Sequence, residues 1–228
     1  MFDTIIVSGG SLQTDFALDF LEKEKTLAQK EKRKFRLIAA DKGLEFFQAA
    51  GQLPDLVIGD FDSLSQKGRA YLDHLEKDTN TRIIRLNVEK DDSDTQSAVN
   101  HAIDLGARSI VILGATGSRF DHMLANLGLL LLGKEKGVRI TILDPHNRIT
   151  LIESGTILER EKQFGEYVSF FPVGGTVHGL SLEGFHYPLR NYDLQPSDSG
   201  LTVSNEIQEE TATVTYTDGT LLMIMSRD

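Results

Sequence analysis

Short apolar runs alternate with helix-length segments through the first part of the chain. Runs typical of buried strands lie at residues 2–7, 35–40, 56–58, 83–86, 110–113 and 139–143. Most lead through a turn into a segment with helical spacing of apolar residues, such as 95–105. Because strands that alternate with helices assemble into a parallel sheet covered on both faces, residues 1–144 are predicted to form an α/β domain with a mainly parallel sheet.

The sequence changes character after residue 144. Helical spacing is lost, and short β-rich runs recur between turn residues at 149–152, 167–171, 176–182, 212–217 and 221–225. Asp218-Gly219, between the last two runs, is a strong signal for a tight hairpin. Residues 145–228 are therefore predicted to form an all-β domain, a small antiparallel sandwich or barrel.

Three acidic clusters follow predicted strands, each just beyond the end of the strand. They are Gly59-Asp60-Phe61-Asp62-Ser63, Lys90-Asp91-Asp92-Ser93-Asp94 and Arg119-Phe120-Asp121-His122. The carboxyl ends of parallel strands meet at one edge of a sheet, so we expect the clusters to come together there. Carboxylates packed closely repel one another unless a cation lies between them. Oxygen ligands suit hard divalent cations, so the pattern indicates Mg²⁺ with bound phosphates.

The first cluster is predicted to direct Asp60 and Asp62 toward one metal ion. Alternate side chains of an extended segment point the same way, which turns Phe61 back into the protein. Gly59 allows the backbone to approach a ligand closely. Ser63 is predicted to be the N-cap of a helix that runs to about residue 78. The alternative to a metal site is a loop with two solvated acids that enters this helix.

The second cluster lies where a helix is predicted to begin, with Ser93 or Asp94 as its N-cap. The helix dipole favours acidic residues at this end, but three of them exceed what capping requires. Asp91 and Asp94 are three residues apart and are expected to project to the same side. Lys90 would offset their repulsion or bind a phosphate oxygen.

The third cluster belongs to a glycine-bearing loop, residues 114–122, that enters another predicted helix. Free backbone N–H groups at such a position bind phosphate, and Arg119 adds a fork-shaped cation. The loop lacks the Gly-Lys-Ser/Thr ending of a Walker motif. His122 is well placed to hydrogen-bond a substrate. We interpret Ser8-Gly9-Gly10 as a turn, although its position directly after the first strand also suits a ligand.

Charge and composition exclude several classes of function. A net charge of −10 argues against nucleic acid and anionic membranes as partners, but not against a nucleotide bridged through a metal. The absence of cysteine removes disulfides and thiolate chemistry and fits a reducing compartment. The N-terminus has no signal-peptide pattern, and the longest apolar stretch, 127–132, is too short to span a bilayer. We expect a cytoplasmic protein.

The order of four motifs resembles that of the thiamine pyrophosphokinase family. The motifs are Asp41-Lys42-Gly43, Gly59-Asp60-Phe61-Asp62-Ser63, Lys90-Asp91-Asp92-Ser93-Asp94 and Gly117-Ser118-Arg119-Phe120-Asp121-His122. Thr202-Val203-Ser204-Asn205, in the β-rich part, is similar to the family's thiamine-side segment. The resemblance therefore covers essentially the whole chain. It implies an α/β nucleotide domain and a C-terminal β-sandwich that binds thiamine, assembled as a homodimer.

The resemblance also implies an activity and a role for each motif. The implied reaction transfers an intact pyrophosphoryl group from ATP to the thiamine hydroxyl, giving thiamine diphosphate and AMP. Mg²⁺ is implied to be held by Asp60, Asp62 and Asp94, with Lys90 and Asp91 lining the reaction centre. The implied nucleotide and phosphate side consists of Asp41, Thr116, Gly117, Arg119, Asp121 and His122. Ser204 and Asn205 are implied to contact thiamine at the dimer interface.

The chain departs from the family pattern in two places. Ser118 stands where the family often has a second glycine, and the chain has no tryptophan, so aromatic stacking on thiamine must come from Phe or Tyr. Two rival functions use the same residues: a metal-dependent phosphohydrolase with water as nucleophile, and a non-catalytic nucleotide- or thiamine-binding protein. Asp91 and Asp94 are equal candidates for the base that accepts the hydroxyl proton.

Overall fold

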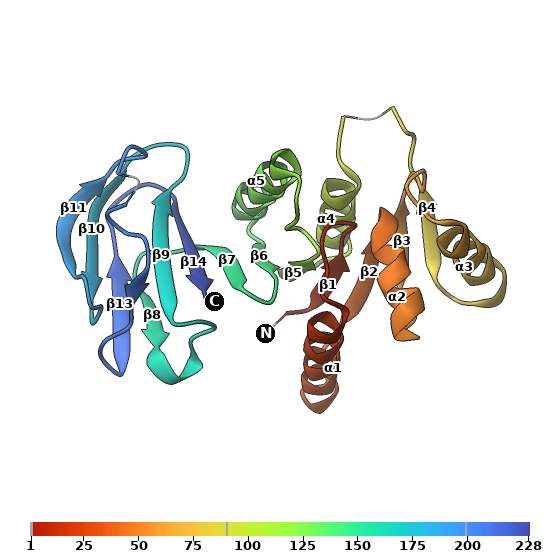
Figure 1. Cartoon of the computed structure of the whole chain (residues 1–228), viewed down its shortest axis with the longest axis horizontal. Coiled ribbons are helices and arrows are strands. Elements are labelled where there is room, and N and C mark those ends of the chain that lie inside the picture. Colours follow the sequence, from red (N-terminus) through yellow and green to blue (C-terminus); the bar gives the residue numbers. More distant parts are fainter. Residues whose placement is uncertain (1, 90, 199) are drawn as a thin grey trace. The chain divides into compact units, whose positions relative to one another are not determined.

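The structure, a computed structural model, describes residues 2–89, 91–198 and 200–228. The chain divides into two compact units, Met1–Pro145 and His146–Asp228. In Figure 1 the first unit runs from red to green and contains the helices, whereas the second runs from green to blue and is built from strands. Among the helices that the structure describes, none combines the length and the apolar character needed to cross a membrane.

The first unit alternates strands with helices. Its elements in chain order are β1 (Thr4–Val7), α1 (Thr14–Lys30), β2 (Arg36–Ala40), the 3-10 helix η1 (Asp41–Gly43), α2 (Leu44–Ala50), β3 (Leu56–Gly59), α3 (Gln66–Asp78), β4 (Arg82–Arg85), α4 (Asp94–Asp104), β5 (Ser109–Leu113), α5 (Phe120–Lys136) and β6 (Arg139–Leu143). The strands lie in the order β6-β5-β1-β2-β3-β4, and every neighbouring pair is parallel. The predicted α/β class is confirmed.

The strand order reverses at β1, which pairs with β2 on one side and β5 on the other. From β1 the chain builds the sheet outward through β2, β3 and β4, and later returns to add β5 and β6. Ligands of open α/β sheets bind beyond the carboxyl ends of the strands at such a reversal. β1 is buried along its whole length and β5 from Ile110 onward, and both are mostly apolar, which makes this edge a rigid base for a site.

The N-caps of α3 and α4 show which polar side chains are used in helix capping and which are available to the site. Ser93 caps α4 as predicted, because its hydroxyl accepts a hydrogen bond from the Gln96 N–H at 3.2 Å. The prediction for α3 was wrong, since its N-cap is Ser65, which accepts from Gly68 N–H at 3.1 Å. The Ser63 hydroxyl donates instead to the Asp41 carboxylate. Ser63 therefore belongs to the site and not to the helix.

The second unit consists of two antiparallel sheets that share one apolar core. Its elements are β7 (Asn147–Ile152), β8 (Thr156–Glu159), the 3-10 helix η2 (Arg160–Lys162), β9 (Tyr167–Pro172), β10 (Val177–Glu183), β11 (Leu189–Leu194), β12 (Asn205–Glu206), β13 (Thr211–Thr215) and β14 (Leu221–Ser226). One sheet has the order β12-β9-β14-β7 and the other β11-β10-β13-β8. Phe170 and Leu221 from the first sheet pack in one cluster with Leu182 and Val214 from the second. The predicted sandwich is confirmed.

The hairpin predicted at Asp218-Gly219 is wrong. β13 pairs with β8 and β10, whereas β14 pairs with β7 and β9, so the turn connects the two sheets and does not close a hairpin. Gly219 has φ +113°, a conformation that residues with a side chain rarely adopt. The dipeptide marks the break between β13 and β14 correctly, but it cannot specify whether the next strand pairs with the preceding one.

Candidate active site

A cavity of about 750 Å³ lies at the carboxyl edge of the parallel sheet, where the strand order reverses. Its walls come from the segments that follow β1, β2 and β5 and from the start of α4. All residues predicted for the nucleotide and phosphate side line this cavity, namely Asp41, Thr116, Gly117, Arg119, Asp121 and His122. Residues 80 positions apart in the chain therefore meet in one cavity, as the parallel sheet requires.

The segment after β1 forms one wall of the cavity, although we interpreted it as a turn. Ser8, Gly9 and Gly10 all line the cavity. The Gly10 N–H donates to the Gly114 carbonyl at 2.9 Å, which joins the exits of β1 and β5. A side chain at Gly10 would lie 2.3 Å from that carbonyl oxygen, so the close approach needs glycine. The position of this segment directly after the first strand was the sequence signal for a ligand, and the segment does line the cavity.

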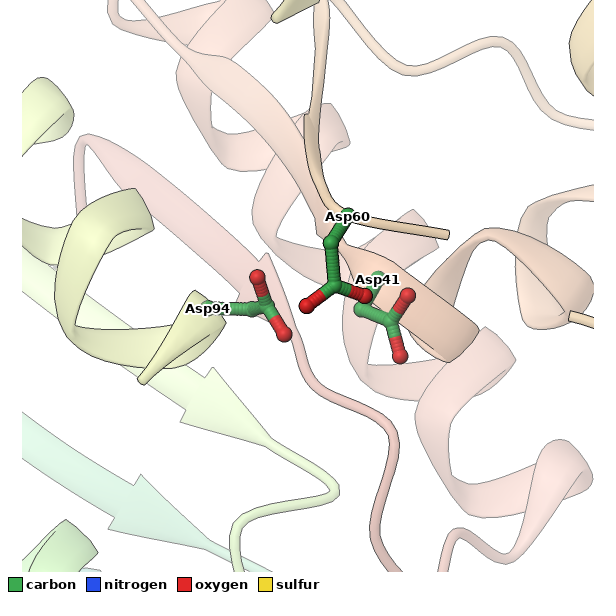
Figure 2. Close-up of side chains that lie close together, drawn as sticks. All are labelled: Asp41, Asp60 and Asp94. Atoms are coloured by element: carbon green, nitrogen blue, oxygen red, sulfur yellow. The ribbon is translucent and has the colours of Figure 1, made fainter. Parts of the chain in front are cut away.

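Three carboxylates converge beside the cavity. Asp41 follows β2, Asp60 follows β3, and Asp94 is the first residue of α4. One oxygen from each lies within 4.8 Å of the others, and all three side chains are half-buried. Figure 2 shows the group, with each side chain arriving from a separate segment. The predicted meeting of the acidic clusters at one sheet edge thus includes residues 60 and 94, with Asp41 as the third member.

The environment of Asp41 is arranged for a cation. Burial raises the pKa of its carboxyl, and the charges of Asp94 and Asp60 add to the rise, whereas a hydrogen bond from Ser63 opposes it. Its Oδ1 atom is buried and has no hydrogen-bond partner among the described residues. The backbone at Asp41 has φ +46°, a conformation that costs energy for a residue with a side chain. A buried oxygen without a donor and three converging charges fit a hard divalent cation.

Asp62 does not share the position of Asp60. The expected extended geometry is wrong, because Phe61 has φ +64° and turns the chain so that residues 60 and 62 do not alternate as on a strand. The Phe61 ring is buried as predicted. Asp62 is exposed, and its backbone N–H donates to Asp60 Oδ1 at 3.2 Å. Its carboxylate lies outside the described three-carboxylate group, and its role as a metal ligand stays a prediction.

Arg69 of α3 holds this loop in its turned conformation. Its Nη2 donates to the Asp62 carbonyl at 2.9 Å and its Nε to the Leu64 carbonyl at 3.2 Å. On the other side, the Ser65 N–H donates to Glu45 Oε1 at 2.8 Å, which lowers the pKa of Glu45. These bonds fix the loop that presents Asp60, and neither Arg69 nor Glu45 was identified from the sequence.

The aspartates of the second acidic cluster lie in different surroundings. The Asp92 carboxylate accepts from the side-chain amides of Gln96 at 2.7 Å and Asn100 at 3.4 Å, which gives it a structural role on α4. Asp94 joins the three-carboxylate group, whereas Asp91 is exposed and outside it. Lys90 lies outside the described residues, so its predicted role at the reaction centre stays a prediction.

Arg119 forms a two-point ion pair with Asp121. Its Nη2 lies 2.6 Å from Asp121 Oδ2, and its Nε donates to Oδ1 at 3.2 Å. This bond and the His122 N–H lower the pKa of Asp121 to about 2, so Asp121 is ionised and able to pair with Arg119 throughout the neutral range. The cavity therefore contains an arginine whose charge is already matched by a carboxylate.

The comparisons with known proteins match both units. Residues 27–142 match the family model described as thiamin pyrophosphokinase, catalytic domain, and residues 155–221 match that of the vitamin B1 binding domain. The chain belongs to the thiamine pyrophosphokinase family. The resemblance stated from the motifs is confirmed. The reaction of this family, transfer of the pyrophosphoryl group from ATP to thiamine, is that of a transferase.

Individual relatives support the same family. The thiamine pyrophosphokinase of Bacillus subtilis (strain 168) is 32% identical over 191 residues, which cover 84% of this chain and 87% of the relative. The crystal structure of thiamine pyrophosphokinase from Bacillus subtilis has a TM-score of 0.83 at 30% identity, with 99% of each chain covered. The structure from Geobacillus thermodenitrificans has a TM-score of 0.80 at 31% identity, with 99% of this chain and 97% of the other covered.

The thiamine-side segment, Ser204 and Asn205, lies in the unit that matches the vitamin B1 binding domain. Ser204 is exposed, has φ +53°, and is tied by its backbone N–H to Ser169 Oγ at 3.0 Å. Asn205 is only 2% exposed. Its side-chain amide donates to the Tyr187 carbonyl at 2.8 Å and accepts from the Tyr187 N–H at 2.9 Å. The two neighbours therefore differ, since Ser204 faces solvent and Asn205 holds a loop.

Replacing Asn205 with alanine should destabilise this thiamine pyrophosphokinase fold. The change leaves the Tyr187 N–H and carbonyl without their side-chain partners, at a cost of about 1–3 kcal/mol for each group that stays buried. Urea unfolding of the full chain measures the loss. Ser204→Ala is the matched control, because its hydroxyl makes no hydrogen bond among the described residues and its removal should hardly change the unfolding free energy. An unchanged stability of Asn205→Ala would contradict the structural role.

Proposed function

We propose that this chain binds ATP with Mg²⁺ in the cavity of the first unit and transfers the pyrophosphoryl group to the thiamine hydroxyl, releasing AMP. The observation that carries the proposal is the group of three carboxylates, Asp41, Asp60 and Asp94, beside a cavity of about 750 Å³. The cavity has room for a nucleotide, and its loops offer backbone N–H groups that suit phosphates.

The three carboxylates are the proposed ligands of Mg²⁺. When bound, the ion would neutralise phosphate charge and act as a Lewis acid and template. Asp41 contributes a buried oxygen that lacks a donor among the described residues. Ser63 holds the other oxygen of Asp41, and Arg69 holds the loop that carries Asp60. Asp62 remains a further ligand implied by the family resemblance.

The residues of the cavity wall are proposed to bind and orient the triphosphate. The loop after β5, with Thr116 and Gly117, presents backbone groups, and Arg119 supplies donors that its pair with Asp121 does not use. His122 is available to hydrogen-bond the nucleotide. The thiamine hydroxyl must lose a proton as it attacks the β-phosphorus. Asp91 and Asp94 remain the two proposed acceptors.

Thiamine is proposed to bind at the second unit through the segment that contains Ser204. The description of the matching family domain supports this assignment. We also propose a homodimer in which the thiamine site lies at the interface between subunits, and a cytoplasmic location. A water-poor interface would keep water away from the reacting phosphate and so limit wasteful hydrolysis of ATP.

One assay tests the proposed function against its rivals. The purified protein is incubated with ATP, Mg²⁺ and thiamine, and every product is identified by mass. AMP and thiamine diphosphate in equal amounts are expected. Phosphate or pyrophosphate released without an acceptor would instead identify a phosphohydrolase. Tight binding of ATP or thiamine without any product would identify a binding protein. Omitting Mg²⁺ or adding a chelator should stop the reaction.

A further inference from the structure

Lys42 borders the same cavity and has no role in the proposal so far. It is the middle residue of η1, directly after Asp41, and it lines the cavity. The start of its side chain lies against the segment after β1, because a Cβ atom placed at Gly9 would be 2.9 Å from the Lys42 Cβ. The side chain therefore begins between the exits of β1 and β2, one residue after Asp41 of the three-carboxylate group.

The charges around the cavity leave an excess of acid. The acidic side chains in its lining are those of Asp41, Asp94 and Asp121, and the basic ones are those of Lys42 and Arg119. Arg119 is already bound to Asp121 at two points. A bound Mg²⁺ would not fully compensate its three proposed ligands Asp41, Asp60 and Asp94, and would leave the charge of a triphosphate largely unmatched. A further cation on the wall of this cavity would favour the binding of such a ligand.

Lys42 is the lining cation whose charge is available. Within residues 2–89, 91–198 and 200–228, its ammonium group has no hydrogen bond or ion pair. Its charge contributes to lowering the pKa of Glu45, but the hydrogen bonds from Ser65 have the larger effect. Lysine is a compact point charge on a flexible stem, which suits a phosphate oxygen without requiring the fixed geometry of arginine.

We infer that Lys42 binds the polyphosphate of ATP, on the side of the cavity that carries the metal ligands. The inference rests on the proposed function for the identity of the nucleotide. The inference concerns the phosphates of ATP and not its adenosine part, because a cation close to Asp41 would bind near the phosphates that a metal ion held by Asp41 would also bind. The adenosine part and the thiamine should be unaffected. Lys42 would then discriminate a nucleoside triphosphate from the monophosphate that is released.

The test compares the binding of ATP and AMP to Lys42→Met by calorimetry in the presence of Mg²⁺. Loss of a hydrogen bond to a charged group should weaken ATP binding by about 10- to 100-fold, whereas AMP binding should change much less. The salt dependence of ATP binding should also become less steep. In kinetics, the KM for ATP should rise and the KM for thiamine should not. Lys42→Arg, which keeps the charge, should recover part of the loss.

Lys67→Met is the matched control, because Lys67 is an exposed lysine of α3 that does not line the cavity. It should bind ATP and AMP as the unmodified protein does. An equal loss of ATP and AMP affinity in Lys42→Met, or no loss, would overturn the inference. Binding is measured without turnover. An unmodified protein that binds ATP but makes no thiamine diphosphate would therefore refute the proposed transferase, whereas a selective loss of ATP binding in Lys42→Met would still support the Lys42 inference. A circular dichroism melt confirms that each variant is folded.

Discussion

Asp60→Asn is expected to abolish Mg²⁺-dependent formation of AMP and thiamine diphosphate while leaving the chain folded. The substitution keeps the shape of the side chain and removes one of three charges that converge within 4.8 Å. Loss of a direct metal ligand should exceed the roughly 10- to 100-fold effect that is typical when an outer-shell partner is lost. Turnover measured over a range of Mg²⁺ concentrations separates weakened metal binding from a failure of the chemistry.

The same variant should lose the stabilisation by Mg²⁺ that the unmodified protein shows. Burial and the charges of Asp94 and Asp60 raise the pKa of Asp41 in the folded chain, so ionisation of Asp41 costs folding stability as the pH rises above the unfolded-state pKa of the group, and costs it in full above the raised pKa. Removal of the Asp60 charge relieves part of this repulsion. Without Mg²⁺, the melting temperature of Asp60→Asn should therefore equal or exceed that of the unmodified protein. The rise in melting temperature on adding Mg²⁺ should be lost.

Asp92→Asn is the matched control, because Asp92 belongs to an acidic cluster of the sequence but bonds Gln96 and Asn100 within α4. It should keep its turnover and its response to Mg²⁺. Asp62→Asn answers a separate question, since the sequence predicts Asp62 as a ligand and the structure places its carboxylate outside the group. Normal turnover by Asp60→Asn would count heavily against the proposed metal site.

The position of the site could be predicted from the sequence, because it depends on the topology of the sheet. Apolar runs that alternate with helices bring the ends of β3 and β5 and the start of α4 to one edge, and acids and glycines lie directly after those runs. The cavity lining confirms the loop 114–122 at that edge. Such an inference needs only the direction of each strand, and the helices that connect successive strands indicate that the strands are parallel.

The membership of the metal group could not be predicted in the same way. It depends on the backbone conformation of single residues, and Asp41 and Phe61 both have positive φ values that their side chains disfavour. The left-handed turn at Phe61 ends the alternation that would have paired Asp62 with Asp60. These conformations are maintained by tertiary contacts such as the bonds from Arg69, which no local pattern records.

Gly43→Ala is expected to cause the largest loss of stability among single-methyl additions near the site. A Cβ atom at Gly43 would lie 1.9 Å from the Val7 carbonyl oxygen and 2.6 Å from its carbon. Val7 is the last residue of β1, which pairs with strands on both sides and cannot move aside. Overpacking of this kind costs about 3 kcal/mol or more. Urea unfolding of the full chain measures the change.

The same contact explains why the effect should extend from stability to activity. Gly43 ends η1, so its close approach to β1 brings Asp41 and Lys42 against the segment after that strand. A methyl group would push these two walls of the cavity apart and move Asp41 away from Asp60 and Asp94. Gly128→Ala on α5 is the control, because nothing lies within 4 Å of its Cβ position and the helix should gain up to about 1 kcal/mol. If Gly43→Ala unfolds at the same urea concentration as the unmodified protein and turns over normally, the close approach of η1 to β1 does not hold the site together.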